Sequence, residues 1–394
     1  MNDEYTDRQQ AIKLYLAGRP VEDICRILGH SRDWFHLWRR RYVAQGPAGL
    51  FDHTHGHASP LRIPPELERT ILNVRHRLES QAHPATRYSQ IGASAILAEL
   101  QALHVQPVPS PRTIERVLQR NQITVPKVRL SRFLSQTTYP APHVTASNEL
   151  HQVDLVGPIY LKGQRRRYYI FVCRDVFDGA VCLKLSPSRT MEAVLTFLGD
   201  CWKTLGRPEQ VQFDNARELV GWGPAACYLS RVIRLCLRFG VEPVFIPPAQ
   251  PYRNGAVEWF NGWFQPPLFQ RRFTRTAALA RELQRVQDTV NTQHVQPRLG
   301  GLTPAQHRRH QKLQLLPQHF TVPTDPLPVA AGRVIFIRQV TPKGHVHLLG
   351  LTYTVGKRLK RQYVKVVLDT QRRRLTIYLA GRIIKRWSYP YLTQ

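Results

Sequence analysis

The pattern of apolar residues from position 149 onward most constrains how this chain of 394 residues can fold. Three apolar runs have the composition of β-strands, and the middle one is apolar on both faces, as in a central strand. They lie near 149–156, 166–174 and 179–186. Helices and strands then alternate, near 190–204, 209–213, 226–239, 242–246 and from 254 onward. This order predicts an antiparallel hairpin sheet extended by parallel strands, with helices on its faces.

Three acidic residues lie in this pattern at positions where a carboxylate needs a compensating partner, such as a cation. Asp154 lies inside an apolar strand run, and Asp214 ends another strand. Glu258 lies near the start of the helix within the stretch Gln250–Asn261. A divalent cation would serve all three, and oxygen ligands select Mg²⁺ or Mn²⁺. For Glu258 taken alone, a solvated helix carboxylate is the commoner role.

The charge of the chain indicates a polyanionic partner. Its 56 Lys and Arg residues exceed its 27 Asp and Glu residues, for a net charge of +29. The six cysteines lack C-x-x-C spacing, which is typical of reduced core cysteines in a cytosolic protein. With no signal peptide and no long apolar run, we expect a soluble intracellular protein that does not enter membranes.

Residues 6–45 predict three helices in a helix-turn-helix arrangement. Ser31 is the expected N-cap of the third helix, and Trp34, Leu37 and Trp38 form its expected buried stripe. The outward residues of that helix are suited to base edges and phosphates: Arg32, Asp33, His36, Arg39 and Arg40. A small helical bundle with an ordinary charged face is the alternative.

A second helical module follows a linker at 46–60, whose alternating histidines, His53, His55 and His57, are weak metal candidates without cysteine partners. The expected helices lie near 64–80, 88–103 and 110–120. Ser110 and Pro111 form an N-cap and first turn. Arg112, Arg116 and Arg120 give the last helix one basic face. We expect this module to contact DNA as well.

The last part of the chain alternates short strand runs with turns that carry Gly, Lys or Arg. Five short strands predict a small β-barrel. Its basic rim, with Arg358, Lys360 and Arg361, is expected to bind phosphates without reading sequence, and Arg253 near Glu258 is a further expected DNA contact. A protein-binding barrel is the alternative.

The motifs around the acids resemble a known family. Asp154, F-D-N-A-R-E around Asp214 and N-G-A-V-E around Glu258 look like the DDE catalytic core of the retroviral-integrase type. With the helix-turn-helix modules and the basic barrel, the chain is similar to bacterial insertion-sequence transposases. The resemblance implies an RNase H-like core, two Mg²⁺ (or Mn²⁺) ions held by the three catalytic acids, and support from Asn215 and Asn254.

Two departures from the family's pattern are visible. Ala216 stands where the family commonly has glycine after the Asp-Asn pair. The gap between Asp214 and Glu258 is longer than usual, which suggests an insertion around Gly221–Pro224.

The expected fold class is multidomain, with all-α helix-turn-helix modules, an α/β RNase H-like core with a mixed sheet, and a small C-terminal all-β barrel. The expected divisions are helix-turn-helix domains at 1–50 and 61–122, a linker at 123–147, the core at 148–312 and the barrel at 329–390.

The resulting hypothesis is a DNA transposase that binds transposon ends and catalyses phosphodiester hydrolysis and strand transfer. We expect double-stranded DNA as partner, a homodimer or higher oligomer, a bacterial nucleoid-associated location and no nucleotide cofactor, since no G-x-x-x-x-G-K-[ST] motif occurs. Two alternatives stay open: a sequence-specific DNA-binding regulator with an inactive integrase-like core, and a stand-alone nuclease of the same fold.

Overall fold

The computed structural model of the chain describes residues 3–52, 63–80, 86–124, 138–216, 228–324 and 327–390. These fall into two compact units, Met1–Leu67 and Glu68–Gln394. The expected insertion around Gly221–Pro224, the histidines at 53, 55 and 57, and most of the expected linker at 123–147 lie outside the described residues. In the described part, no helix has the length and apolar character needed to cross a membrane.

The first unit contains the expected three helices, α1 (Asp3–Leu16), α2 (Val21–Leu28) and α3 (Arg32–Gln45). The predicted N-cap is confirmed, because the Ser31 hydroxyl accepts a hydrogen bond from the Trp34 N–H at 3.1 Å. The predicted burial of Leu37 is wrong: its side chain is 44% exposed, and Phe35 is buried in its place. Neighbouring apolar residues on a short helix compete for one buried face, and periodicity alone does not decide which one wins.

The segment after α3 belongs to this unit and is not the start of a linker. It forms a short 3-10 helix, η1 (Gly46–Leu50), that ends on the buried Leu50. Arg8 is buried, stacks 3.7 Å above the Trp38 ring and donates to the Leu50 carbonyl at 3.2 Å. A cation–π contact and a hydrogen bond therefore hold the end of the unit in place.

Three further helices follow as predicted: α4 (Pro65–Glu79), α5 (Ala93–Ala102) and α6 (Pro111–Arg120). Each carries one fully buried isoleucine: Ile71, Ile96 and Ile114. The Ser110 hydroxyl accepts from the Thr113 N–H at 3.1 Å, which confirms the predicted N-cap of α6.

The core is built on a mixed sheet in the predicted order. Its strands are β1 (Leu150–Tyr160), β2 (Arg167–Asp175), β3 (Val181–Ser186), β4 (Gln210–Phe213) and β5 (Glu242–Phe245). β1 pairs antiparallel with β2, and β2 antiparallel with β3. On its other side β1 pairs in parallel with β4, which pairs in parallel with β5.

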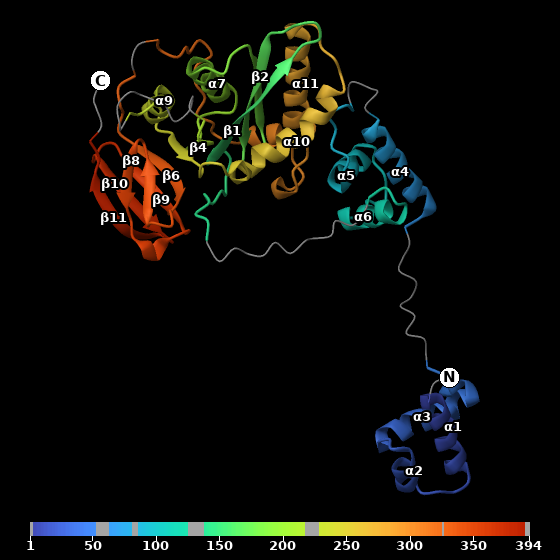
Figure 1. The fold of residues 1–394 in the computed structure, drawn as a ribbon. Coiled ribbons are helices and arrows are strands. Elements are labelled where there is room, and N and C mark those ends of the chain that lie inside the picture. Colours follow the sequence, from blue (N-terminus) through green and yellow to red (C-terminus); the bar gives the residue numbers. More distant parts are fainter. Residues whose placement is uncertain are drawn as a thin grey trace. The chain divides into compact units, whose positions relative to one another are not determined.

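Helices cover both faces of this sheet (Figure 1). On one face, α7 (Met191–Thr204) and α9 (Arg231–Arg238) contribute Trp202, Leu235 and other residues to one hydrophobic core. On the other face, α10 (Gly255–Phe269) and α11 (Thr276–Gln293) contribute Phe260, Val286 and others to a second core. α11 leads through η3 (Pro297–Leu299) to α12 (Pro304–Arg308). The α/β core with a mixed sheet is therefore as expected.

The C-terminal strands form the expected all-β module, but most of them extend the sheet of the core. They are β6 (Arg333–Gln339), β7 (His345–Leu348), β8 (Leu351–Thr354), β9 (Tyr363–Asp369), β10 (Arg374–Leu379) and β11 (Arg382–Ser388). β6 pairs in parallel with β5, and the nine-stranded order is β11-β10-β9-β6-β5-β4-β1-β2-β3. Only the hairpin β7–β8, whose second strand was not expected, forms a separate small sheet.

A buried carboxylate joins the segment before α5 to the core. Glu282 of α11 is 4% exposed and accepts hydrogen bonds from Arg87 at 2.8 Å and Tyr88 at 2.9 Å. It also forms ion pairs with Arg271 at 2.6 Å and Arg285 at 3.0 Å. Burial raises the pKa of Glu282, but the hydrogen bonds from Arg87, Tyr88 and Arg271 outweigh it, and the pKa lies below 4.5.

Replacing this carboxylate should destabilise the protein. We expect Glu282→Ala to lower the free energy of unfolding by roughly 2–3 kcal/mol at pH 7, somewhat less than for a fully buried network because two of the arginines stay half exposed. A depressed carboxyl pKa stabilises above the unfolded pKa and stops doing so as pH falls through the folded value. The difference in the free energy of unfolding between Glu282→Ala and wild type, measured by urea unfolding, should therefore become smaller as the pH falls.

The matched control is Arg281→Ala, an exposed position on the same helix, which should leave the unfolding midpoint nearly unchanged. An equal effect of the two substitutions at pH 7 would show that Glu282 does not hold the junction.

Candidate active site

Asp154 lies in the middle of β1, the strand that joins the antiparallel and parallel halves of the sheet. It pairs with Val172 of β2, and its side chain shares a face with that of Gln152 because side chains alternate along a strand. The position is half-buried. A carboxylate placed here is held by the hydrogen-bonded backbone of a central strand.

Asp214 is the first residue after β4. The parallel register pairs Gln152 with Gln212, and extending it by two residues places Asp214 beside Asp154. The Asp214 carboxylate accepts a hydrogen bond from the Ala216 N–H at 2.9 Å, which orients it. Asp154 and Asp214 line the same cavity, which has a volume of about 170 Å³.

The charges of the three acids act on one another at Asp154. Burial is the largest cause that raises the pKa of Asp154, and the charges of Asp214 and Glu258 raise it further. Hydrogen bonds from the Leu155 N–H and the Asn261 amide oppose this rise. The resulting pKa is about 6, so ionised Asp154 is destabilised by its surroundings.

Glu258 lies in the first turn of α10 and is half-buried, and burial raises its pKa. Across the described ranges of the chain, no group of three or more His, Cys, Asp or Glu side chains is close enough to hold a metal ion. The charge of Glu258 still acts on Asp154 and raises its pKa, although the three carboxylates do not converge on one point.

Gln152 on β1 positions the helix that carries Glu258. Asn254, at the N-cap position of α10, makes no side-chain capping bond. Instead the side-chain oxygen of Gln152 accepts from the backbone N–H groups of Ala256 at 2.9 Å and Val257 at 3.1 Å. Two N–H groups that the first helical turn leaves unpaired are thereby satisfied by the strand that bears Asp154.

Two further amides complete this connection. The Gln212 side chain on β4 donates to the Arg253 carbonyl and to the Asn254 side-chain oxygen, both at 3.1 Å. Asn254, which is 2% exposed, donates to the Val153 carbonyl at 3.0 Å. Asn254 therefore ties the start of α10 to β1 and β4. Gln212 was not among the residues expected at this site, because a glutamine in a short strand has no distinctive spacing.

Asn261 contacts the candidate catalytic carboxylate directly. Its side-chain amide donates to Asp154 at 2.7 Å from one turn beyond Glu258. Its side-chain oxygen is buried and has no hydrogen-bond partner in the part of the chain that the structure describes. Asn261 ends the stretch Gln250–Asn261 that carries Glu258, and no role at the site was expected for it from the sequence.

Asn215 is held by the C-terminal module. It donates to the Ile246 carbonyl and accepts from Arg338 of β6 at 2.8 Å. Arg338, which is 7% exposed, also donates to the Ile246 carbonyl at 3.1 Å, and burial lowers its pKa to about 10. The loop after Asp214 is thus fixed by a buried arginine from outside the expected core.

The side chains around Asp154 have the donor chemistry of a site for a hard divalent cation. Asp154 and Asp214 line one cavity and offer carboxylate oxygens, which Mg²⁺ and Mn²⁺ prefer, whereas Glu258 is not among the residues that line it. A cation near them would offset the repulsion that raises the pKa of Asp154. The unpartnered Asn261 oxygen is a group that a bound ion or its water would satisfy.

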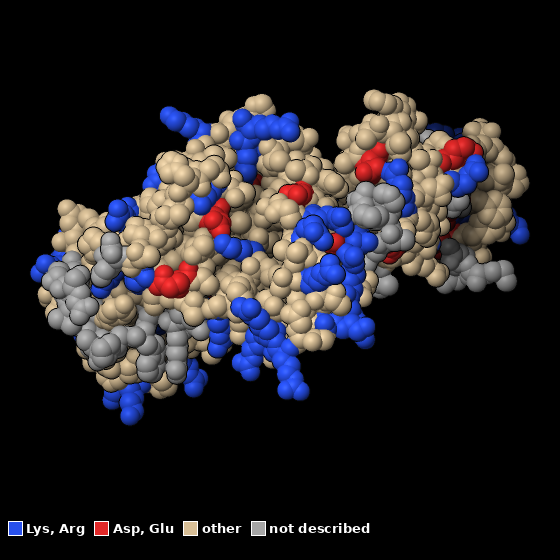
Figure 2. Space-filling model, turned by 90° about the horizontal axis from the view of Figure 1, so that it is seen from above, with Lys and Arg blue, Asp and Glu red and all other residues tan. Residues whose placement is uncertain are grey.

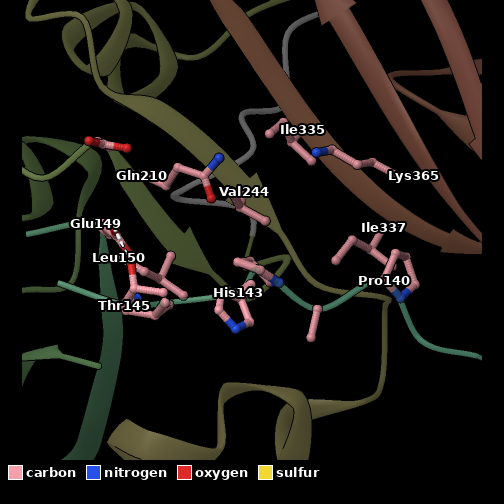
Figure 3. A pocket seen from close by; sticks show the side chains of 14 residues that line it. Pro140, His143, Thr145, Glu149, Leu150, Gln210, Val244, Ile335, Ile337 and Lys365 are labelled. Atoms are coloured by element: carbon pink, nitrogen blue, oxygen red, sulfur yellow. Dashed lines mark hydrogen bonds between the residues drawn. The ribbon is translucent and has the colours of Figure 1, made fainter. Parts of the chain in front are cut away.

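A larger cavity, of about 430 Å³, lies away from these acids (Figure 3). Residues 140–145 run along the sheet and form one wall, while Ile335, Ile337 and Lys365 form another. The segment that precedes β1 thus lies over the place where the core and C-terminal strands join. Its size does not make it the reactive centre, because none of the three acids lines it.

Of the expected DNA contacts on α3, Arg32, His36 and Arg40 are exposed. Arg39 is half-buried, with its guanidinium 4.8 Å from the centre of the Tyr15 ring. Arg39 therefore packs in part against α1, and Arg40 is the freer of the two neighbouring arginines.

The other expected DNA contacts lie on three different elements. The exposed ones are Arg112 and Arg116 on α6, and Arg358, Lys360 and Arg361 in or beside η4 (Lys357–Leu359). Arg253 is half-buried, and its guanidinium lies 3.9 Å above the Tyr139 ring and 5.0 Å from that of Tyr363. It therefore anchors the segment before β1 in addition to any role on DNA.

Comparison with known proteins identifies the N-terminal modules. Models of homeodomain-like domains match residues 3–51 and residues 34–118. The helix-turn-helix prediction is therefore confirmed. No curated protein matches the chain.

Among solved structures, the catalytic core domain of HTLV-2 integrase in complex with magnesium matches in a trimeric form with a TM-score of 0.31 and 19% identity, over 40% of this chain and 95% of that one. Its dimeric form matches with a TM-score of 0.32 and 20% identity, over 41% and 97%. A simian T-cell lymphotropic virus intasome in complex with PP2A regulatory subunit B56 gamma matches with a TM-score of 0.35 and 20% identity, over 72% and 88%.

The homeodomain-like modules agree with the resemblance to insertion-sequence transposases with an integrase-like core. So does the order of strands and helices that carries Asp154 on β1, Asp214 after β4 and Glu258 on α10.

The raised pKa of Asp154 leads to a stability prediction for the metal-free protein. A carboxyl whose folded pKa exceeds its unfolded value destabilises the fold above the folded pKa and has no such effect below the unfolded one. Asp154→Asn should therefore raise the unfolding temperature at pH 7.5. For a shift of roughly two pKa units, the free energy of unfolding should increase by up to about 3 kcal/mol. The gain should vanish near pH 4.

Calorimetry with EDTA at both pH values measures this difference, and Asp288→Asn on the exposed side of α11 is the control. A gain that is the same at pH 4 and pH 7.5 would contradict the charge repulsion inferred at Asp154.

Proposed function

We propose that the chain is a DDE transposase that binds the ends of a DNA element and joins them to target DNA. One observation carries the proposal: Asp154 and Asp214 line a single cavity, and the charge of Glu258 acts on Asp154. The two homeodomain-like matches and the net charge of +29 support DNA as the substrate.

In this proposal Asp154, Asp214 and Glu258 would hold two Mg²⁺ or Mn²⁺ ions. When bound, such ions would supply positive charge that stabilises the attacking and departing oxygens of an in-line displacement. Asn261 orients the Asp154 carboxylate, while Gln152 and Asn254 fix the start of α10 and so the position of Glu258. Asn215, held by Arg338, supports the loop that follows Asp214.

The proposed reaction has two steps that balance without a nucleotide. In the first, water attacks a phosphodiester at the element's end, a new P–O bond forms and the 3′ oxygen leaves as a hydroxyl. In the second, that 3′ hydroxyl attacks a target phosphodiester and loses its proton, and the target's own 3′ oxygen departs and takes up a proton. One P–O bond replaces another, so no ATP is required.

The partners follow from this chemistry. Two ends must be held together for joining, so we propose a dimer or higher oligomer on double-stranded DNA. The exposed α3 residues would read end sequences, and the basic groups around η4 would bind phosphates. We propose a nucleoid-associated location in a bacterial cytoplasm.

A second candidate is a sequence-specific DNA-binding regulator with an inactive integrase-like core. The spacing of the carboxylates favours it, since among the described residues no three of them are close enough to hold a metal ion. The next experiment separates the two functions.

Asp154→Asn, Asp214→Asn and Glu258→Gln should each lower strand joining at least a thousandfold, because each removes a charge that the ions require. Binding to the same DNA should stay within about twofold, since the substitutions leave the helix-turn-helix modules intact. The assay is purified protein with Mg²⁺, labelled duplexes from the sequences flanking the gene, and a plasmid.

Asp288→Asn is the matched control and should join DNA at the wild-type rate. Joining at the wild-type rate by any one active-site variant removes that residue from the catalytic set. Binding without joining by the wild-type protein in both Mg²⁺ and Mn²⁺ favours the regulator.

Arg40→Ala should weaken binding to end DNA about three- to tenfold and reduce the dependence of log affinity on log salt by about one, as for a single phosphate contact. Fluorescence anisotropy at several salt concentrations measures both. Arg26→Ala, at an exposed position on α2, should change neither. Identical curves for Arg40→Ala and wild type would exclude Arg40 of α3 as a DNA contact.

A further inference from the structure

A second basic surface lies where the turn between β1 and β2 meets the end of α10. We name it the hairpin platform and define it by seven exposed residues: Lys162, Arg165, Arg166, Arg167, Arg271, Arg272 and Arg275. Seen from above, Lys and Arg side chains gather on the surface of the core, with few Asp or Glu side chains among them (Figure 2). None of these residues was among the DNA contacts expected from the sequence.

Hydrogen bonds between the β1–β2 turn and the segment after α10 give the platform a defined shape. The Lys162 N–H donates to the Phe273 carbonyl, and the Gln164 side chain donates to the Thr274 carbonyl, both at 2.8 Å. A hollow of about 340 Å³ lies between the two segments, and Tyr160 is among the residues that line it, with 54% of its surface exposed. The cations are therefore mounted on two segments that are locked to each other.

The platform has little acid to neutralise it. Arg271 pairs with Glu282 at 2.6 Å, and that carboxylate also binds Arg87 and Arg285. The other six platform cations have no acidic partner in the part of the chain that the structure describes. Like charges on one surface repel one another, and a polyanion that lies across them relieves that repulsion.

We propose that the hairpin platform binds the phosphate backbone of duplex DNA, at a distance from the active site set by α10. The proposal rests on the proposed function for the identity of the polyanion. A duplex carries one negative charge per ~1.7 Å of its axis. It therefore matches cations that are spread over two surface segments better than a small anion bound in a single pocket does.

The helix also sets where on the DNA this contact falls. Eleven residues of α10 separate Glu258 from Phe269, where the helix ends, which corresponds to roughly 17 Å along the helix axis at a rise of about 1.5 Å per residue. A duplex that lies parallel to α10 would, at about 3.4 Å per base pair, place about five base pairs between the reacting bond and the platform.

The test uses the full chain and a random-sequence duplex of about 30 base pairs, long enough to span the platform and the active site. Arg165→Ala/Arg272→Ala removes one cation from each segment, and Arg309→Ala/Lys312→Ala removes two exposed cations near α12, at the other end of the sheet strands. The platform variant should bind about tenfold more weakly, and its slope of log affinity against log salt should fall by roughly two. The control should match wild type.

The proposal is overturned if the platform variant has the same DNA affinity and the same salt slope as the control. That result would also be expected if the platform binds an acidic protein instead of DNA. With an end duplex that the wild type joins, ethylation of phosphates about five base pairs from the reacting bond should weaken wild-type binding and leave the variant unaffected. Interference confined to other positions overturns the placement.

The proposed function can be refuted without affecting the proposal for the platform. Joining by Asp154→Asn would refute the catalytic assignment and leave the slope difference between platform and control variants intact.

Discussion

The central constraint on this protein is the burial of the Asp154 carboxylate in the middle of a central strand. Burial is the largest cause that raises the pKa of Asp154 to about 6, and the charges of Asp214 and Glu258 raise it further. The surrounding amides are arranged to tolerate it: Asn261 donates to the carboxylate, and Gln152 and Asn254 fix the helix that carries the third acid. The fold thus maintains an unfavourable charge cluster, which is typical of functional sites.

The rest of the chain is connected to this cluster by buried charged groups. On one side, Glu282 fastens the segment around Arg87 and Tyr88 to α11. On the other, Arg338 of β6 holds Asn215 beside Asp214, and β6 itself pairs with β5. The C-terminal module therefore contributes to the shape of the loop that follows Asp214.

Much of the fold was predictable because local patterns agree with the tertiary structure. The strands and helices of the core, the N-caps at Ser31 and Ser110, and the α/β class follow from periodicity and capping residues, which act over a few positions. Leu37 and the strand β8 were missed for the opposite reason. Which of two neighbouring apolar residues is buried, and whether four residues form a strand, depend on what packs against them.

The sequence by itself determined the order of elements and the presence of Asp154, Asp214 and Glu258 at their distinctive places in it. Only the tertiary structure decided that β1 and β4 pair in a register that sets the two aspartates side by side. It alone showed that Gln152 and Gln212 support α10, and that Lys162 and Arg272 share one surface. The physical reason is the range of the forces involved: helix and strand patterns arise between near neighbours, whereas register, buried amide bonds and surface charge clusters join residues far apart along the chain.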